Sequence, residues 1–378
     1  MCTNLETRHL RGLGRSVSAL GAGCWTIGGP ATNRGVPIGW DHVDSGRAFA
    51  GLLHAHDLGV TLYDTADVYG LGRSERLLGR LLSLVRRSDL VISSKVGYLA
   101  SAAHPYADGQ MRRQLECTLA NLGTNYLDVY FFHSTDFGEG DQYLPGAIKQ
   151  MRALVEHGLV RAVGMRAPHT FALEWATGPS HERCTHEAAR FLHLYEEIRP
   201  DVLTVRHNLL SPLYTPDETD VFDLAESQGV GVIIKQALGQ GVLLGTHCPD
   251  RMRAFRQGDH RRQDPMFTPE ALHEVHHGLA SVREHFGEAV SDLARVALRY
   301  ALARDPAAPV LVGFRDAEQI NTTITSLGEA LTTAEITWLH QLLAPLRDAF
   351  TARMAKSHAP CPSVRRLPSG MGAPTIKE

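Results

Sequence analysis

Four residues of the sequence carry side chains that together can exchange a proton with a substrate: Asp64, Tyr69, Lys95 and His133. A free tyrosine has a pKa of about 10 and exchanges protons poorly at neutral pH, but a neighbouring ammonium group stabilises the phenolate and lowers that pKa. Lys95 supplies an ammonium group, Asp64 supplies its countercharge, and the His133 ring can orient a carbonyl oxygen. Such a set can protonate an alkoxide or remove the proton of an alcohol.

The positions of these residues predict that they lie together. Asp64, Lys95 and His133 each end a run of apolar residues, and Tyr69 follows Asp64 by five positions. If the runs are parallel strands of a barrel, their carboxyl ends meet at one mouth, where barrel enzymes hold their active sites. A single polar residue at a strand end is more simply explained as the partner of a loop, but four of them favour a catalytic cluster.

Short apolar runs alternate with longer segments of helical periodicity, which is the pattern of repeated βα units. We expect strands at residues 17–25, 60–64, 90–95, 127–133, 160–165, 202–206, 230–235 and 310–313. We expect helices at residues 46–58, 73–85, 110–122, 145–156, 186–198, 221–228, 289–303 and 317–327. The predicted fold class is α/β, a single (β/α)8 TIM barrel with long βα loops, a C-terminal helix and a tail.

The remaining segments define the predicted organisation of the chain. Residues 168–184 and 239–269 interrupt the alternation with glycine and polar residues, so we expect long loops there. The C-terminal helix is expected at residues 333–353. We assign residues 1–355 to the barrel and 356–378 to a tail that either covers the barrel or is disordered.

The composition excludes several classes of partner. A formal net charge of −3 over 378 residues provides no basic surface for nucleic acid or for an anionic membrane. No apolar run is long enough to span a bilayer and no secretory signal is visible, so we expect a cytoplasmic protein that acts on a small molecule. The six cysteines contain no Cys-x-x-Cys pair, which indicates neither a zinc site nor a disulfide framework. The oligomeric state stays open.

One motif points to a different chemistry. Residues 273–277 match His-Glu-x-x-His, in which two zinc ligands and a general-base glutamate share one helix. No histidine or glutamate follows at the usual distance for a third ligand, and Leu272, Val275 and Leu279 form an ordinary apolar stripe. We therefore predict no metal site.

Three segments resemble the aldo-keto reductase family. Residues 59–75 are similar to its signature around the catalytic aspartate and tyrosine, and residues 91–96 and 122–133 are similar to its lysine and histidine segments. Weaker similarity continues in order to about residue 330. The resemblance implies NADPH as hydride carrier and Tyr69 as general acid. It also implies an oxidoreductase that reduces an aldehyde or ketone to an alcohol, or catalyses the reverse.

The resemblance further implies which residues contact the cofactor. The matching positions lie at the ends of the later strands and in the segments after them: Arg166, Asn208, Lys235, Leu238, Gly241, Gly313, Arg315 and Gln319. Among these, Arg315 and the start of the helix that follows it are expected to hold a phosphate of NADPH.

Some of these positions depart from the family pattern. Arg166 and Ala167 replace a Ser-Asn pair that holds the nicotinamide carboxamide, and Lys235 replaces an aromatic residue that stacks on the ring. His207 replaces a tyrosine. Arg166 and Lys235, and His207 if it lies near the mouth, suit an anionic substrate or a phosphate. An equally simple interpretation is that Arg166 and Lys235 pair with carboxylates of the long loops.

Two other functions remain open on the sequence alone. A lyase, dehydratase or epimerase would use Tyr69 and Lys95 for proton transfer on an anionic substrate, and a regulatory barrel would bind a nucleotide without turnover. The substrate is expected to meet loops at residues 25–40, 134–141, 168–184 and after 239. Apolar walls are expected from Trp25, Tyr98 and Trp175.

Overall fold

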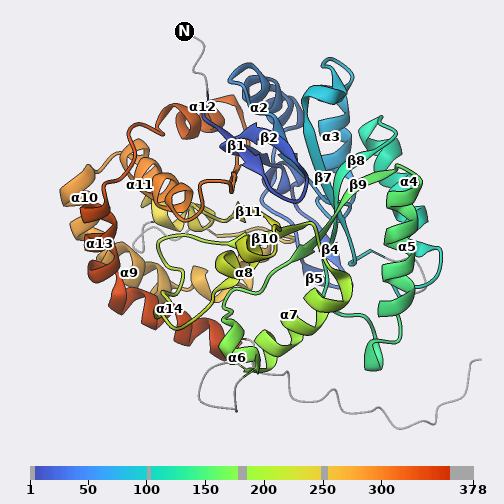
Figure 1. Cartoon of the computed structure of the whole chain (residues 1–378). Helices are drawn as coiled ribbons and strands as arrows, with labels where there is room; N and C mark the ends of the chain where they lie inside the picture. The colour runs from blue at the N-terminus through green and yellow to red at the C-terminus, as the bar shows by residue number, and fades with distance from the viewer. Residues whose placement is uncertain (1–4, 100–103, 178–184, 248–253, 358–378) are drawn as a thin grey trace, which may run out of the picture.

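The computed structural model describes residues 5–99, 104–177, 185–247 and 254–357. Its centre is a closed barrel of parallel strands in the order β10-β11-β12-β3-β6-β7-β8-β9. These strands are β3 (Leu20–Gly23), β6 (Leu62–Asp64), β7 (Val91–Val96), β8 (Leu127–Phe132), β9 (Val160–Arg166), β10 (Val202–Arg206), β11 (Gly231–Lys235) and β12 (Val310–Gly313). The expected (β/α)8 fold is therefore confirmed (Figure 1).

A helix follows each barrel strand along the chain and covers the outside of the barrel (Figure 1). These helices are α2 (Ser45–Asp57), α3 (Arg73–Leu82), α4 (Gln110–Leu122), α5 (Leu144–Glu156), α7 (Thr185–Ile198), α8 (Val221–Ser227), α11 (Val290–Ala303) and α12 (Ala317–Thr325). Each presents an apolar stripe to the strands, as Leu77, Leu78 and Leu81 do in α3. No helix among the described residues is both long and apolar enough to cross a membrane.

The first predicted strand is wrong as a single element. Residues 17–25 contain the end of β2 (Arg15–Ser18) and the whole of β3, because β2 pairs with β1 (Thr7–Leu10) in an antiparallel hairpin before the barrel begins. Leu10 and Val17 of this hairpin are buried in the apolar cluster inside the barrel. The hairpin therefore closes the amino-terminal end of the barrel.

Further short elements lie in the segments that connect the barrel strands and the covering helices. They are α1 (Trp25–Gly28), β4 (Thr32–Asn33), β5 (Val36–Pro37), η1 (Arg87–Asp89), η2 (Glu139–Asp141), α6 (Leu173–Thr177), η3 (Gly239–Leu244), η5 (His260–Arg262) and η6 (Pro265–Phe267). The predicted long loop at residues 239–269 thus contains three 3-10 turns in its described part.

The C-terminal third builds a second apolar cluster beside the barrel. It joins η3, η6 and α11 to α9 (Pro269–Gly278), α10 (Ala280–Phe286), α13 (Thr333–Leu342) and α14 (Ala344–Ser357) (Figure 1). The single helix predicted at residues 333–353 is two helices, because Pro345 lacks the N–H that a continuous helix needs. Residues 358–378, most of the predicted tail, lie outside the described residues.

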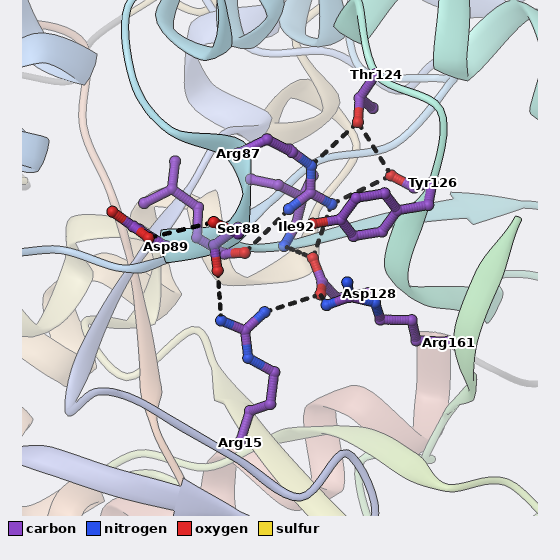
Figure 2. Close-up of polar contacts among 10 residues, drawn as sticks. Arg15, Arg87, Ser88, Asp89, Ile92, Thr124, Tyr126, Asp128 and Arg161 are labelled. Atoms are coloured by element: carbon purple, nitrogen blue, oxygen red, sulfur yellow. Dashed lines mark hydrogen bonds and ion pairs between the residues drawn. The ribbon is translucent and has the colours of Figure 1, made fainter. Parts of the chain in front are cut away.

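A buried carboxylate holds the amino-terminal end of the barrel together (Figure 2). Asp128, near the start of β8, is fully buried and accepts hydrogen bonds from Arg87 at 2.7 Å, Arg161 at 2.9 Å and Arg15 at 3.2 Å. It also accepts the backbone N–H of Ile92 at 2.9 Å. One side chain therefore connects the hairpin, the turn η1 and the strands β7, β8 and β9.

We predict that Asp128→Asn destabilises the fold by about 3–5 kcal/mol, because three guanidinium groups lose a buried counter-charge. Urea unfolding followed by circular dichroism measures the loss. Arg161→Gln is the control and should cost under about 1 kcal/mol, since the Arg161 side chain is 44% exposed. Equal losses in the two variants would contradict the central role of Asp128.

Candidate active site

A cavity of about 1200 Å³ opens at the carboxyl ends of the strands. All four residues of the proposed proton-transfer cluster line it: Asp64 from β6, Tyr69 from the loop after β6, Lys95 from β7 and His133 directly after β8. The structure therefore brings together the residues that the sequence places at successive strand ends.

The buried ion pair at the base of the cavity joins Lys95 to Asp64. The Lys95 Nζ atom lies 2.6 Å from Asp64 Oδ2 and donates a second hydrogen bond of 2.6 Å to the Thr65 carbonyl. The other carboxylate oxygen of Asp64 accepts the Ser93 hydroxyl at 2.7 Å. Burial alone would lower the pKa of Lys95, but Asp64 and Tyr69 outweigh it and raise this pKa above its usual value. Lys95 is therefore held as an ammonium group.

Tyr69 lies against this ammonium group, with Lys95 Nζ 4.7 Å from the centre of the phenol ring. Burial raises the pKa of Tyr69 to about 12, and Lys95 opposes that shift without reversing it. We expected from the sequence that Lys95 would lower this pKa below that of a free tyrosine. The difference arises because Tyr69 packs between Trp25 and His133, whose ring centres each lie 6.0 Å away, and this desolvation outweighs the charge of Lys95. Tyr69 is therefore a protonated phenol at neutral pH.

His133 is a neutral imidazole in this site. Burial lowers its pKa well below the usual value, and the charges of Lys95, Arg166 and Lys235 lower it further. Its Nδ1 atom is buried and has no hydrogen-bond partner within the described residues. The Tyr98 ring packs edge-on against it with the ring centres 4.7 Å apart. The imidazole is thus neutral, packs against Tyr98 and lines the cavity.

Two further basic side chains face the same cavity. Arg166 ends β9 and Lys235 ends β11, and both line the cavity. The one hydrogen bond of the Arg166 guanidinium in the described part of the chain is a long contact of 3.5 Å with the Tyr98 hydroxyl. No described carboxylate pairs with either residue. The interpretation that they pair with loop carboxylates is therefore not supported by the described residues.

Aromatic residues form another part of the cavity wall. Trp25 packs on His260 with ring centres 4.3 Å apart, and Trp40 lies 5.0 Å from the same ring. The His260 ring contacts the Gly39 carbonyl at 2.9 Å and the Gln240 side chain at 2.6 Å. The backbone of residues 258–260 is hydrogen-bonded to Ala31 and Gly39, so the segment after β11 is joined to the segment after β3.

Another part of the cavity carries two arginines and the start of α12. Arg315 and Gln319 line it, and the Arg315 backbone N–H donates to Gln319 Oε1 at 3.0 Å. Arg47 also lines it and pairs with Asp316, the N-cap of α12, at 2.7 Å. Guanidinium groups and a helix N-terminus are groups that bind anions in proteins.

Most of the remaining residues expected to contact the cofactor also line the cavity: Leu238, Gly241 and Gly313. Asn208 lies elsewhere. Its side chain is buried, donates to the Gln236 carbonyl at 2.9 Å and accepts the Leu210 N–H at 2.8 Å. In this structure Asn208 therefore shapes the loop after β10 and does not line the cavity.

Two other residues that we expected near the site, His207 and Trp175, lie outside the cavity. His207 stacks on Tyr300 at 5.3 Å, and burial lowers its pKa to about 3, so it contributes no cation at the mouth. The side chains of neighbouring strand residues alternate in direction, which sends His207 away from the interior that Thr204 faces. Trp175 donates to Glu218 at 2.8 Å and forms no wall of the site, whereas the expected walls Trp25 and Tyr98 do line it.

The loops expected to meet the substrate contribute unequally to the lining of the cavity. Of the described residues in 134–141 none lines the cavity, and of those in 168–177 only His169 does. The wall residues Trp40, Gln240 and His260 were not singled out from the sequence. No spacing pattern marks them, because they meet only when two loops distant in sequence fold against each other.

The His-Glu-x-x-His motif lies on α9 and has a structural role. Glu274 pairs with Arg353 of α14 at 2.9 Å. No group of three or more ligand-type residues that could hold a metal occurs among the described residues.

An eight-stranded parallel barrel with ionisable side chains at the carboxyl ends of its strands is typical of a barrel enzyme. The family model for the Aldo/keto reductase family matches residues 19–344. The chain is 28% identical over 330 residues to an L-glyceraldehyde 3-phosphate reductase of Escherichia coli O157:H7, with 83% of this chain and 89% of the relative covered. It is 24% identical over 345 residues to an NADH-specific methylglyoxal reductase of Escherichia coli K12, covering 88% and 96%.

Solved structures agree on the fold. The glycerol dehydrogenase AKR11B4 of Gluconobacter oxydans superposes with a TM-score of 0.68 at 21% identity, covering 98% of this chain and all of that one. The chain belongs to the aldo/keto reductase family. It is an NAD(P)H-dependent oxidoreductase that interconverts an aldehyde or ketone with an alcohol, and the family match and the two Escherichia coli relatives favour that activity over the non-redox alternative.

We predict that Lys95→Met lowers the free energy of unfolding by about 3–5 kcal/mol, because Asp64 is left as an unpaired buried carboxylate. Urea unfolding measures the loss. Adding Asp64→Asn to this variant should restore part of the stability, since the buried charge is then gone. A double variant less stable than Lys95→Met would contradict this explanation.

Proposed function

We propose that Tyr69 is the general acid of the reduction and that Lys95, Asp64 and His133 support it. The observation that carries this proposal is the placement of a protonated phenol against a buried ammonium group in the wall of the cavity. A carbonyl oxygen between Tyr69 and His133 gains negative charge as the carbonyl is reduced. The Tyr69 hydroxyl donates its proton to that oxygen.

The Lys95 ammonium group stabilises the product of this step. Proton donation leaves a phenolate on Tyr69, and the charge of Lys95 favours that anion. Asp64 and the Thr65 carbonyl hold the ammonium group in position at 2.6 Å each. His133, which is neutral, carries one ring N–H that can donate to the substrate oxygen.

The nicotinamide cofactor supplies the hydride when bound. We propose NADPH, with Arg315, Gln319 and the start of α12 at its phosphate end and Leu238, Gly241 and Gly313 along the cavity. Relatives differ in this respect: one is named NADH-specific, and an aldo/keto reductase from Klebsiella pneumoniae was solved with NADP and acetate. The two cations Arg47 and Arg315 favour the more anionic cofactor.

We also propose that the enzyme works in the cytoplasm on a small molecule. The free thiols of Cys24 and Cys117 and the use of a reduced nicotinamide suit a reducing compartment.

Tyr69→Phe should lower kcat for aldehyde reduction by about 10²–10⁴-fold, because the proton donor is lost. Cofactor binding, followed by quenching of tryptophan fluorescence from Trp25 and Trp40, should persist. Tyr143→Phe, which removes a hydroxyl outside the cavity, is the control and should keep its activity. A Tyr69→Phe enzyme of normal activity would remove Tyr69 from the mechanism.

The pH profile supplies an independent test on a neutral aldehyde and its alcohol. Tyr69 stays protonated below its pKa of about 12, and His133 stays neutral above its lowered pKa, so the reduction rate should be flat from about pH 6 to 9. Alcohol oxidation needs the phenolate and should accelerate over the same range, approaching about tenfold per pH unit. A reduction rate that falls through neutral pH would contradict the assignment.

Arg315→Ala should raise the Kd for NADPH about 10–100-fold and change the Kd for NADH little, because a charge-assisted contact to the 2′-phosphate is lost. Fluorescence titration of both cofactors measures this. Equal weakening of the two would show that Arg315 serves another group, and no binding of either cofactor to the wild-type protein would reject the proposed cofactor.

A further inference from the structure

The turn that follows Tyr69 has a strained backbone. Gly70, Leu71 and Gly72 come directly after Tyr69, and their φ angles are all positive, at 63°, 52° and 82°. Glycine adopts this left-handed conformation freely, but leucine does so at an energetic cost because its Cβ atom crowds the backbone. Leu71 is 50% exposed, so the packing of its side chain does little to offset that cost. Contacts made by neighbouring residues must therefore hold the turn in this conformation.

The Arg73 side chain supplies such contacts. Arg73 is the first residue of α3, directly after the turn, and its Nη1 atom donates to the carbonyls of Ile27 and Gly28 at 3.2 Å each. Its Nη2 atom donates to the Val43 carbonyl at 2.5 Å and to the Ser45 hydroxyl at 2.9 Å. One guanidinium group thus joins the end of the turn to α1 and to the start of α2.

These contacts hold the turn against α1. The backbone of Tyr69 and Gly70 packs so closely on Gly28 that a Cβ atom added at Gly28 would lie 2.8 Å from the Tyr69 carbonyl carbon. Trp25, at the start of α1, stacks on the Tyr69 ring with the ring centres 6.0 Å apart. The position of the turn relative to α1 therefore sets the position of the Tyr69 phenol beside Lys95.

We propose that Arg73 is a positioning residue of the reduction: it clamps the turn against α1 and so keeps the Tyr69 hydroxyl aligned with the substrate oxygen. This inference rests on the proposed role of Tyr69 as general acid. Arg73 does not belong to the described lining of the cavity, so it acts through Tyr69 and not on the ligand. A catalytic group misplaced by about 1 Å can lose about 10²-fold in rate, so a remote clamp has a large effect.

Separate hydrogen bonds keep the turn folded when Arg73 is changed. The Ser74 hydroxyl donates to the Cys24 carbonyl at 2.8 Å and lies 2.8 Å from the Thr65 hydroxyl. The Gly72 N–H donates to the Asp67 carbonyl at 2.8 Å. Replacing Arg73 is therefore expected to loosen the turn without unfolding the chain.

Arg73→Met removes the guanidinium group and keeps an unbranched side chain. It should lower kcat for aldehyde reduction about 10–100-fold, because the proton donor is misplaced. The Kd of the cofactor should change under about threefold, because no contact with the ligand is altered. Arg73→Lys can satisfy only some of the four acceptors and should lose less than Arg73→Met. Arg80→Met removes an exposed arginine farther along α3, is the control and should change neither quantity.

A double variant shows whether the loss passes through Tyr69. Adding Arg73→Met to Tyr69→Phe should lower kcat by under about threefold more, because the two changes impair the same step. Multiplied losses in the double variant would overturn the positioning role. So would a kcat of Arg73→Met within about threefold of the wild-type value, or a cofactor Kd that rises as much as kcat falls.

Hydrogen exchange separates this inference from the proposed function. Exchange of the backbone amides of residues 66–74, followed by mass spectrometry of the full chain, should become about tenfold faster in Arg73→Met and stay unchanged in Arg80→Met. Unchanged exchange in Arg73→Met would reject the clamp even if Tyr69 proves to be the general acid. If Tyr69→Phe keeps normal activity, the proposed function fails, whereas faster exchange in Arg73→Met still supports the clamp.

Discussion

The ion pair between Lys95 and Asp64 sits where the barrel strands converge, and the arrangement of the mouth depends on it. An ammonium group is costly to bury unless a carboxylate and further hydrogen-bond acceptors surround it. The Thr65 carbonyl completes the shell of Lys95, and the Ser93 hydroxyl completes that of Asp64. Because these partners come from β6, β7 and the residue after β6, the registers of adjacent strands are fixed by the same contacts that set the charge beside Tyr69.

Burial and charge act on the site in opposite directions, and their balance gives each residue a defined protonation state. For Tyr69 the effect of burial on the pKa exceeds that of Lys95, so the phenol keeps its proton. For Lys95 the neighbouring charges exceed the effect of burial, so the amine also keeps its proton. For His133 both effects favour the neutral ring. An acid, a cation and a neutral donor thus stand side by side at neutral pH, which is the combination that carbonyl reduction requires.

The sequence predicts the barrel and its central cluster because both depend on local patterns. An apolar run that ends in Asp64, Lys95 or His133 places that residue at the mouth whatever the loops do. What the sequence misses depends on contacts between distant segments. The hairpin that contains Val17 follows from strand register. The outward direction of His207 follows from the alternation of side chains, and the wall built by His260 follows from loop packing. The Asn208 side chain likewise forms hydrogen bonds that shape the loop after β10, and no sequence motif marks that loop.

The aromatic wall of the cavity has a consequence for how a ligand is received. Residues 258–260 are hydrogen-bonded to Ala31 and Gly39, and the Arg261 guanidinium lies 4.0 Å from the Trp40 ring. The two loops therefore keep their spacing before anything enters. Ordering flexible loops around a ligand consumes conformational entropy that would otherwise appear as affinity. Because contacts within the protein already join these two loops, less entropy is left to lose at this wall when a ligand binds.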